Sequence, residues 1–229
     1  MTHVSSPAAA AAQLAARLRG ARLLHPRGRT FTGEWETLGT SGPWWGAAIL
    51  DEPSRRPAIV RISKGAPTPT GWPDILGFAV SLPGPVDLLF SSAFRPPLLR
   101  HVPRPRRNFG GSYGTILAYR TPVARIFLAT MPAAAVGTTL DDVVRAATIR
   151  GVALTVAAAT RWSRWRPVAV VRFGVPLGAD TDATLAFNPV TNHAPDLVPV
   201  GRLQQARGIM YRASQRGRGV RPAENRSGP

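Results

Sequence analysis

From residue 29 onward, hydrophobic and polar residues alternate over short stretches that end at proline or glycine. With 23 prolines and 22 glycines among 229 residues, the chain suits short strands joined by tight turns better than a bundle of helices. The alternation predicts strands over residues 29–35, 58–63, 75–82, 86–90, 115–119, 123–130, 168–175 and 184–187. We therefore expect an α+β fold in which roughly eight strands form a closed, mostly antiparallel β-barrel with a few helices packed outside it.

Helical patterns stand on both sides of the strand region and within it. Residues 7–24 are alanine-rich with leucines near one side, which predicts a helix, and further helices are predicted over 138–159 and about 200–217. The predicted organisation is an N-terminal helical arm over 1–24, a barrel domain with a C-terminal helix over 25–219, and a disordered tail over 220–229.

The helix predicted over 138–159 begins with the sequence Thr-Thr-Leu-Asp-Asp. Threonine before the first turn and acidic residues within it are typical of a helix N-terminus, where exposed N–H groups need acceptors. We therefore interpret Asp141 and Asp142 as capping residues and not as a catalytic pair of acids.

The chain is strongly basic, with a net charge of +17 and an isoelectric point near 11.9. Such a charge is typical of proteins that bind nucleic acid. Of the 29 basic residues, however, Lys64 is the only lysine, and so uniform a use of arginine can reflect genome composition. The arginines are also dispersed, with local peaks at 95–107 and after residue 202. We therefore expect that any binding of nucleic acid is non-specific.

Several classes of protein are excluded by what the sequence lacks. The absence of cysteine excludes disulfides, thiolate zinc sites, cysteine nucleophiles and c-type haem attachment. The four histidines have no metal-ligand spacing, and no P-loop, GxGxxG, GxSxG or HExxH motif occurs. The sequence contains no apolar run of about 18 residues, so it predicts no membrane-spanning helix. The N-terminus has no basic region before its apolar stretch, so we expect a cytoplasmic protein without a signal peptide.

Near the C-terminus, the segment ARGIMYRASQRGR, residues 206–218, combines arginines with a single tyrosine. On a helix, one stripe about 80° wide contains four of its side chains, Arg207, Tyr211, Gln215 and Arg218. One interpretation is a solvated basic stripe. The other is functional: a guanidinium one turn from a phenol lowers the phenol pKa, and a phenolate is a ligand for ferric haem iron.

The pattern RxxxYxxxQRxR, from Arg207 to Arg218, resembles the proximal haem motif of the catalase superfamily. Earlier segments resemble that family in the same order. LLHPRGRTFTGEW resembles the segment with the distal histidine, which falls on His25. PAIVRISKG resembles the VRFS strand, with Arg61 and Ser63 at its functional positions. PDILGFAVSL and VDLLFSSAF resemble the two strands that follow.

The resemblance implies that the chain binds haem b and reacts with hydroperoxides. Tyr211 would be the iron ligand, held as phenolate by Arg207, and Gln215 would belong to the same motif. Arg61 and Arg218 would bind haem propionates. His25 would be the general acid and base, and Ser63 would form a hydrogen bond with it.

The sequence also departs from the family pattern. The distal asparagine would fall near Ser91, which we include among the candidate catalytic residues. The chain is shorter than typical catalases, so it resembles a reduced form without their arm and C-terminal helical region. FNPVTNHAPDLVPVGRL resembles a stretch that lies well before the proximal tyrosine in long catalases. Either a deletion separates that stretch from Tyr211, or Tyr211 belongs to it and the true ligand is absent.

Two functions therefore remain open. The first is a small catalase-related haem protein with peroxidase, weak catalase or hydroperoxide-rearranging activity. Such a protein could form a homo-oligomer. The alternative is a haem-free binding protein of the catalase fold, with a basic surface for nucleic acid or other anionic partners.

Overall fold

The computed structural model describes residues 27–39, 44–66, 68–69, 71–134, 136–178, 181–182 and 185–200. Its strands are β1 (Arg27–Thr37), β2 (Ser54–Lys64), β3 (Leu76–Leu82), β4 (Val86–Ser92), β5 (Tyr113–Gly114), β6 (Tyr119–Arg120), β7 (Arg125–Pro132), β8 (Val152–Ala159), β9 (Arg166–Pro176) and β10 (Val198–Pro199). Its helices include α2 (Ala48–Asp51) and α3 (Leu140–Arg150). The predicted arm and tail lie outside the described residues, as does the predicted C-terminal helix beyond its first residue.

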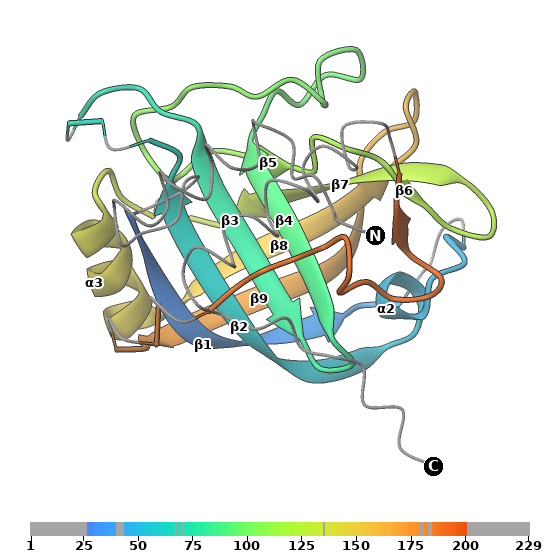
Figure 1. Ribbon diagram of the computed structural model, residues 1–229, viewed down its shortest axis with the longest axis horizontal. Helices are drawn as coiled ribbons and strands as arrows, with labels where there is room; N and C mark the ends of the chain where they lie inside the picture. The colour runs from blue at the N-terminus through green and yellow to red at the C-terminus, as the bar shows by residue number, and fades with distance from the viewer. Residues whose placement is uncertain are drawn as a thin grey trace, which may run out of the picture.

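Eight of these strands close into a barrel in which every pairing is antiparallel (Figure 1). The order around the barrel is β1, β2, β3, β4, β5, β7, β8 and β9, and β9 pairs back onto β1. Pairing of β7 with β8 over six residue pairs completes the ring, while β6 and β10 extend from β7. The closed antiparallel barrel predicted from the sequence is confirmed.

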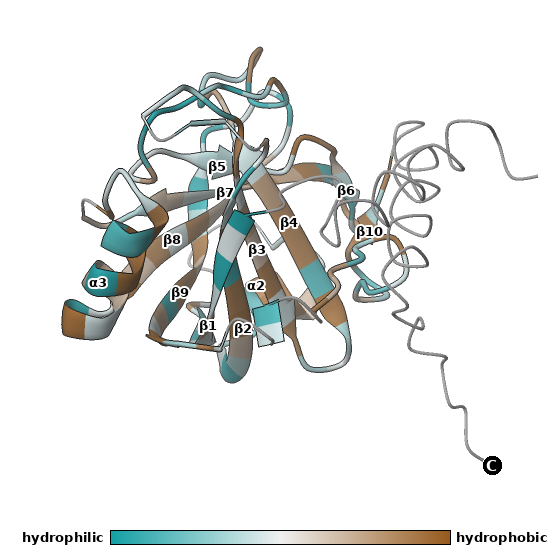
Figure 2. Cartoon of the chain, turned by 60° about the vertical axis from the view of Figure 1, so that its left-hand side comes forward, coloured by the Kyte–Doolittle hydropathy of each residue, from teal (hydrophilic) through white to brown (hydrophobic). Residues whose placement is uncertain are grey.

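The alternation along each strand separates an interior face from an outer face. Phe31 and Phe173 meet inside the barrel with ring centroids 4.9 Å apart, and Phe78 and Phe90 meet there at 5.6 Å. All four side chains are at most 3% exposed. Figure 2 shows hydrophobic residues along most of the strands, polar residues on many of the loops, and both kinds on α3. Burial of the apolar interior face is the main favourable term for such a barrel.

Helix α3 begins as the sequence predicts but ends earlier. The Thr139 side chain accepts a hydrogen bond from the Asp142 N–H, and the Asp142 carboxylate accepts one from the Thr139 N–H. The bond from the Thr139 N–H to the carboxylate is the largest cause that holds the pKa of Asp142 below its ordinary value. The predicted helix over 138–159 is wrong in its second half, because Gly151 ends α3 with a φ of 67° and residues 152–159 form strand β8.

Two predicted strands are also wrong. Residues 115–118 form an irregular connection between β5 and β6, and residues 185–187 belong to no strand. Both segments have β-branched or apolar residues, but neither finds a neighbouring strand edge over its full length. Sheet pairing, and not local preference, decides which such segments become strands.

A segment that we call the outer strap, the described parts of residues 177–200, crosses the outer face of the barrel. In Figure 1 it is the orange to red trace that passes over β2, β3 and β4. The Leu177 N–H donates to the Thr30 carbonyl at 2.8 Å, and the Asn188 N–H donates to the Asp87 carboxylate at 2.7 Å. Val200 then donates to the Ala118 carbonyl at 2.9 Å. The strap therefore covers part of the barrel wall that β1 to β4 form.

Candidate functional site

The strand register aligns five small residues in one row across β1 to β5. Gly28 pairs with Ser63, and Ser63 pairs with Gly77. Gly77 then pairs with Ser91, and Ser91 pairs with Gly114. Residues directly opposite in an antiparallel sheet share one face. The structure therefore brings the predicted residues Ser63 and Ser91 to the same face, two strand spacings or about 10 Å apart.

This small-residue row lies on the outer face of the barrel wall. The neighbouring residues Ile62, Phe78 and Phe90 point into the hydrophobic interior, so the alternating residues of the same strands point outward. Ser63 and Ser91 are nevertheless only 4% and 9% exposed. The row therefore presents only small side chains on a face of the wall that other parts of the chain already cover.

Arg61 projects from β2 on the same face as Ser63, two residues away. Its side chain is 4% exposed, and Asp182 of the outer strap holds it with Nε–Oδ1 at 2.7 Å and Nη2–Oδ2 at 3.2 Å. The Thr30 hydroxyl donates to the same carboxylate. A Cβ on Gly28 would collide with the Arg61 guanidinium, so glycine at position 28 makes room for this ion pair. A ligand carboxylate that binds Arg61 must therefore join or replace Asp182.

A cavity of about 410 Å³ opens beside the row. Its walls include five cationic side chains, Arg27, Arg29, Lys64, Arg106 and Arg107. Asp182 and Asp141 also line it, as do residues from the first turn of α3. Pairing of Arg27 with Lys64, adjacent to the pair Gly28 and Ser63, joins the cavity to the row.

The cations of this cavity differ in their contacts. Lys64 donates to the carbonyls of Thr68 and Pro69 at 2.9 and 3.1 Å, and Arg29 pairs with Asp141 at 3.3 Å. The Nε of Arg106, in contrast, is buried without a hydrogen-bond partner. Burial, with a contribution from Arg104, lowers the Arg106 pKa, as expected for a charge removed from water. The cavity therefore favours an anionic group.

These features fit a haem in part. The row of glycines and serines suits a planar ring, and the cationic walls suit carboxylates such as propionates. Arg61 fits less well, because Asp182 already neutralises it. Among the described residues, no group of three or more His, Asp or Glu side chains could hold a metal ion. The predicted residues His25, Arg207, Tyr211, Gln215 and Arg218 lie outside the described residues.

Tyr113 is a buried tyrosine within the barrel, but it does not suit an iron ligand. Its hydroxyl donates to the Phe109 carbonyl at 3.0 Å, and burial raises its pKa far above the ordinary value. A phenol in this state stays protonated at neutral pH. Tyr113 therefore has a structural role at the β5 edge.

Sequence reasoning did not include Gly28, Gly77 and Asp182 among the site residues, although Gly77 belongs to the PDILGFAVSL resemblance. A glycine inside a strand pattern can indicate a close approach of another group, so the two glycines carried a usable signal. Asp182 carried none, because 121 residues separate it from Arg61 and only the fold brings them together.

Comparison with known proteins supports the fold. No protein-family model matches the sequence, and no curated protein matches it. The structure is similar to that of a fungal catalase, with a TM-score of 0.69 and 13% identity over 86% of this chain and 59% of that chain. It is similar to catalase A from Saccharomyces cerevisiae, with a TM-score of 0.67 and 14% identity over 91% and 64%. It is also similar to the structure of a bacterial catalase, with a TM-score of 0.68 and 15% identity over 96% of this chain and 62% of that chain.

The chain therefore has the fold of the catalases, as its sequence pattern predicted. It spans about three fifths of the length of the catalases that it matches. At such identities the likeness is one of fold, and the chemistry has to be argued from the site. None of the described helices is long and apolar enough to cross a membrane.

Proposed function

We propose that the chain is a catalase-related haem protein that reacts with hydroperoxides. The observation that carries this proposal is the small-residue row on a barrel of the catalase fold, with Arg61, Ser63 and Ser91 on the same outer face. The motif from Arg207 to Arg218 supports it independently, since its order in the sequence agrees with that of the VRFS-like strand. Bound haem would supply the redox-active iron for cleavage of the peroxide O–O bond.

The roles of the protein residues follow from their chemistry. Tyr211 would bind iron as a phenolate, and the Arg207 guanidinium would favour that charged form. His25 accepts a proton from the incoming peroxide and returns it to the leaving oxygen, and Ser63 orients the imidazole by a hydrogen bond. Ser91 supplies a hydroxyl where the family has an amide. Arg61 and Arg218 would bind the propionates, and Arg61 would have to release or share its contact with Asp182.

The first test is reconstitution with haemin. We expect a Soret band for the wild-type protein and a shifted or much weaker band for Tyr211→Phe, because the substitution removes the phenolate ligand. Arg212→Gln is the matched control, since Arg212 lies off the predicted stripe and its loss should leave the spectrum unchanged. Identical spectra for wild type and Tyr211→Phe would reject Tyr211 as the ligand, and no band in either would reject the haem proposal.

The second test concerns the general acid and base. We expect His25→Ala to retain haem and to lose about 10²–10⁴-fold in peroxide turnover, the usual contribution of a positioned proton-transfer group. Stopped-flow kinetics with hydrogen peroxide and with an organic hydroperoxide measure this loss. Turnover within a factor of two of wild type would contradict the role of His25.

Substrate choice follows from the departures in the distal region. In the proposed alignment Ser91 stands where the catalase family has an amide, and that amide would orient small hydrogen peroxide. Orientation accounts for much of a barrier reduction, so catalatic turnover should fall more than use of larger substrates. We expect a higher kcat/KM for an organic or fatty-acid hydroperoxide than for hydrogen peroxide. Rapid oxygen release with a preference for hydrogen peroxide would contradict this.

The second candidate is a haem-free binding protein with a basic surface. It is favoured by the cationic cavity and by exposed arginines on the loops of the barrel. Absorbance of the purified protein distinguishes the two candidates, because only the first has a Soret band. If the protein binds DNA, we expect affinity to fall steeply with salt through counterion release. Discrimination between DNA sequences at physiological salt would contradict non-specific binding.

A further inference from the structure

Two segments along one edge of the barrel carry a group of exposed arginines. The first segment, residues 95–107, follows β4. The second, residues 160–166, comprises the connection from β8 to β9 and the first residue of β9. We call the two segments together the arginine tip. Six of its arginines are exposed: Arg95, Arg104, Arg107, Arg161, Arg164 and Arg166. Neither loop contains an aspartate or glutamate. Within the part of the chain that the structure describes, none of the six forms a salt bridge.

Arg100 joins the two loops into one surface. This side chain is 1% exposed, and its Nη1 and Nη2 donate to the carbonyls of Thr160 and Ser163 at 2.5 and 3.0 Å. Its guanidinium also lies over the Trp165 ring at 4.5 Å, and Trp165 Nε1 donates to the Arg95 carbonyl at 3.0 Å. The contacts cross in both directions, so the arginine tip is a preformed surface.

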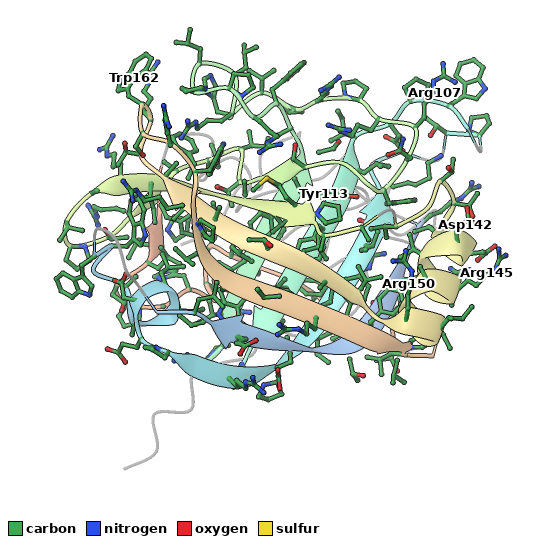
Figure 3. The ribbon with its side chains drawn as sticks, turned by 180° about the vertical axis from the view of Figure 1, so that it is seen from behind. Arg107, Tyr113, Asp142, Arg145, Arg150 and Trp162 are labelled. Atoms are coloured by element: carbon green, nitrogen blue, oxygen red, sulfur yellow. The ribbon has the colours of Figure 1, made fainter. Side chains whose placement is uncertain are left out.

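The arginine tip also exposes large apolar side chains. Leu98 is 62% exposed, Leu99 is 43% exposed and Trp162 is 65% exposed. In Figure 3, Trp162 points away from the barrel at one end of the upper edge, and Arg107 lies at the opposite end of that edge. In Figure 1 the green loop after β4 and the light-orange turn between β8 and β9 both lie along the upper edge. Exposed hydrophobic residues grouped in this way mark an interaction site.

We propose that the arginine tip binds the surface of a membrane that contains anionic lipids. Leu98, Leu99 and Trp162 enter the boundary between headgroups and acyl chains, and the surrounding arginines bind lipid phosphates. Attraction to anionic lipids and burial of apolar area are the two terms that hold a protein at such an interface. Tryptophan is enriched at this depth because its ring is apolar and its N–H is polar.

The apolar residues distinguish a membrane from nucleic acid. Nucleic-acid surfaces combine cations with aromatic rings that stack on bases, and leucine offers no such stacking. Two adjacent exposed leucines between arginines suit a surface where hydrocarbon lies under a layer of phosphates. Arginine also suits phosphates better than lysine does, since its planar guanidinium donates two parallel hydrogen bonds.

Co-sedimentation of the full chain with vesicles tests the proposal. One set contains phosphatidylcholine with phosphatidylglycerol, and the other contains phosphatidylcholine alone. We expect binding to the anionic vesicles and much weaker binding to the neutral ones. Leu98→Ser combined with Leu99→Ser should lower the partition coefficient about tenfold, and Arg161→Gln combined with Arg164→Gln should lower it about tenfold or more.

Matched controls separate insertion from general charge. Arg55→Gln with Arg172→Gln removes the same charge from the barrel wall, and Ile149→Ser removes an apolar side chain that is 76% exposed on α3. Both should change the partition coefficient less than about threefold, because they lie away from the arginine tip. Emission of Trp162 should shift to the blue on binding, judged against Trp162→Phe.

Each other outcome overturns the proposal. Absence of binding to anionic vesicles by the folded wild-type protein does so directly. Binding that depends on Arg161 and Arg164 but not on Leu98 and Leu99 indicates attraction to any polyanion. If the same dependence appears with DNA, the arginine tip is a nucleic-acid surface. Circular dichroism of every variant confirms its fold, and none of these outcomes depends on haem.

Discussion

Two regions of this molecule differ in whether their arginines pair with carboxylates. On the outer wall of β1, β2 and β9, the Glu36 carboxylate pairs with Arg55 and Arg172, and Asp182 pairs with Arg61. On the arginine tip the six exposed arginines have no salt bridge within the described residues. The sequence contains no acidic residue between Asp87 and Asp141. The position of the few carboxylates, more than the number of arginines, therefore decides where positive charge remains available to a partner.

The contrast extends to the two arginines that are buried. Arg61 and Arg100 are 4% and 1% exposed, but a carboxylate neutralises Arg61 whereas Arg100 is held by backbone carbonyls and a Trp165 ring. Burial without a counter-charge lowers the Arg100 pKa. A side-chain substitution can remove either partner of the Arg61–Asp182 ion pair and so destabilise the fold. The backbone carbonyls that hold Arg100 cannot be removed in this way.

The largest effect is therefore expected from Asp182→Ala. Without the carboxylate, the Arg61 guanidinium stays buried with no counter-charge, and breaking a buried pair costs about 3–5 kcal/mol; because Asp182 is partly accessible, we expect about 3 kcal/mol. Urea denaturation at neutral pH measures the loss. Asp141→Ala, which breaks the exposed pair with Arg29, is the control and should cost less than about 1 kcal/mol. Equal effects of the two substitutions would contradict the difference between buried and exposed pairs.

Replacement of Arg100 should have a smaller but still large effect. Arg100→Leu removes two charge-assisted hydrogen bonds but keeps part of the packing on Trp165, so we expect a loss of about 2 kcal/mol in the free energy of unfolding. The residues 160–166 should also become more sensitive to protease, because Arg100 holds them to the first loop. Arg95→Leu, at an exposed position of the same loop, is the control. Unchanged protease sensitivity would show that other contacts join the loops.

The sequence predicted the barrel better than the contacts that complete it. Alternation located β1, β2, β3, β4, β7 and β9 closely. It failed at residues 152–159, because the small residues there suit a helix or a strand equally well. Pairing with β7 and β9 makes this segment a strand.

The same limit applies to the candidate site. Local motifs indicated Arg61 and Ser63, and the register then placed Ser91 on their face. The partner of Arg61 could not be predicted, because the sequence carries no information about which distant carboxylate the strap brings to the wall. The roles of His25 and Tyr211 stay predictions that spectroscopy and kinetics can test.

A smaller effect is expected from a carboxylate held by amides. Asp87 accepts hydrogen bonds from the Asn188 N–H at 2.7 Å and from Asn192 Nδ2 at 2.8 Å, but burial dominates and raises its pKa. The folded state therefore holds the proton more firmly than the unfolded state does. Stability should fall as pH rises through the window just above the ordinary value of about 3.9. The Tm of Asp87→Asn relative to wild type should rise across that window, and a constant difference would contradict the shift.

The smallest effect is expected at Glu36, on the exposed wall. Its hydrogen bond to Arg172 is the largest cause of a lowered pKa, and the bond to Arg55 comes next. A lowered folded pKa stabilises the protein above the ordinary glutamate value, and this contribution is lost as pH falls through the folded pKa. Because the group is solvated, Tm should change little in Glu36→Gln, and salt should reduce the change further. Titration of the Glu36 carboxyl by NMR is the sensitive measurement. We expect Arg172→Gln to raise the Glu36 pKa more than Arg55→Gln does, and the reverse order would show that the pair on β2 is the stronger one.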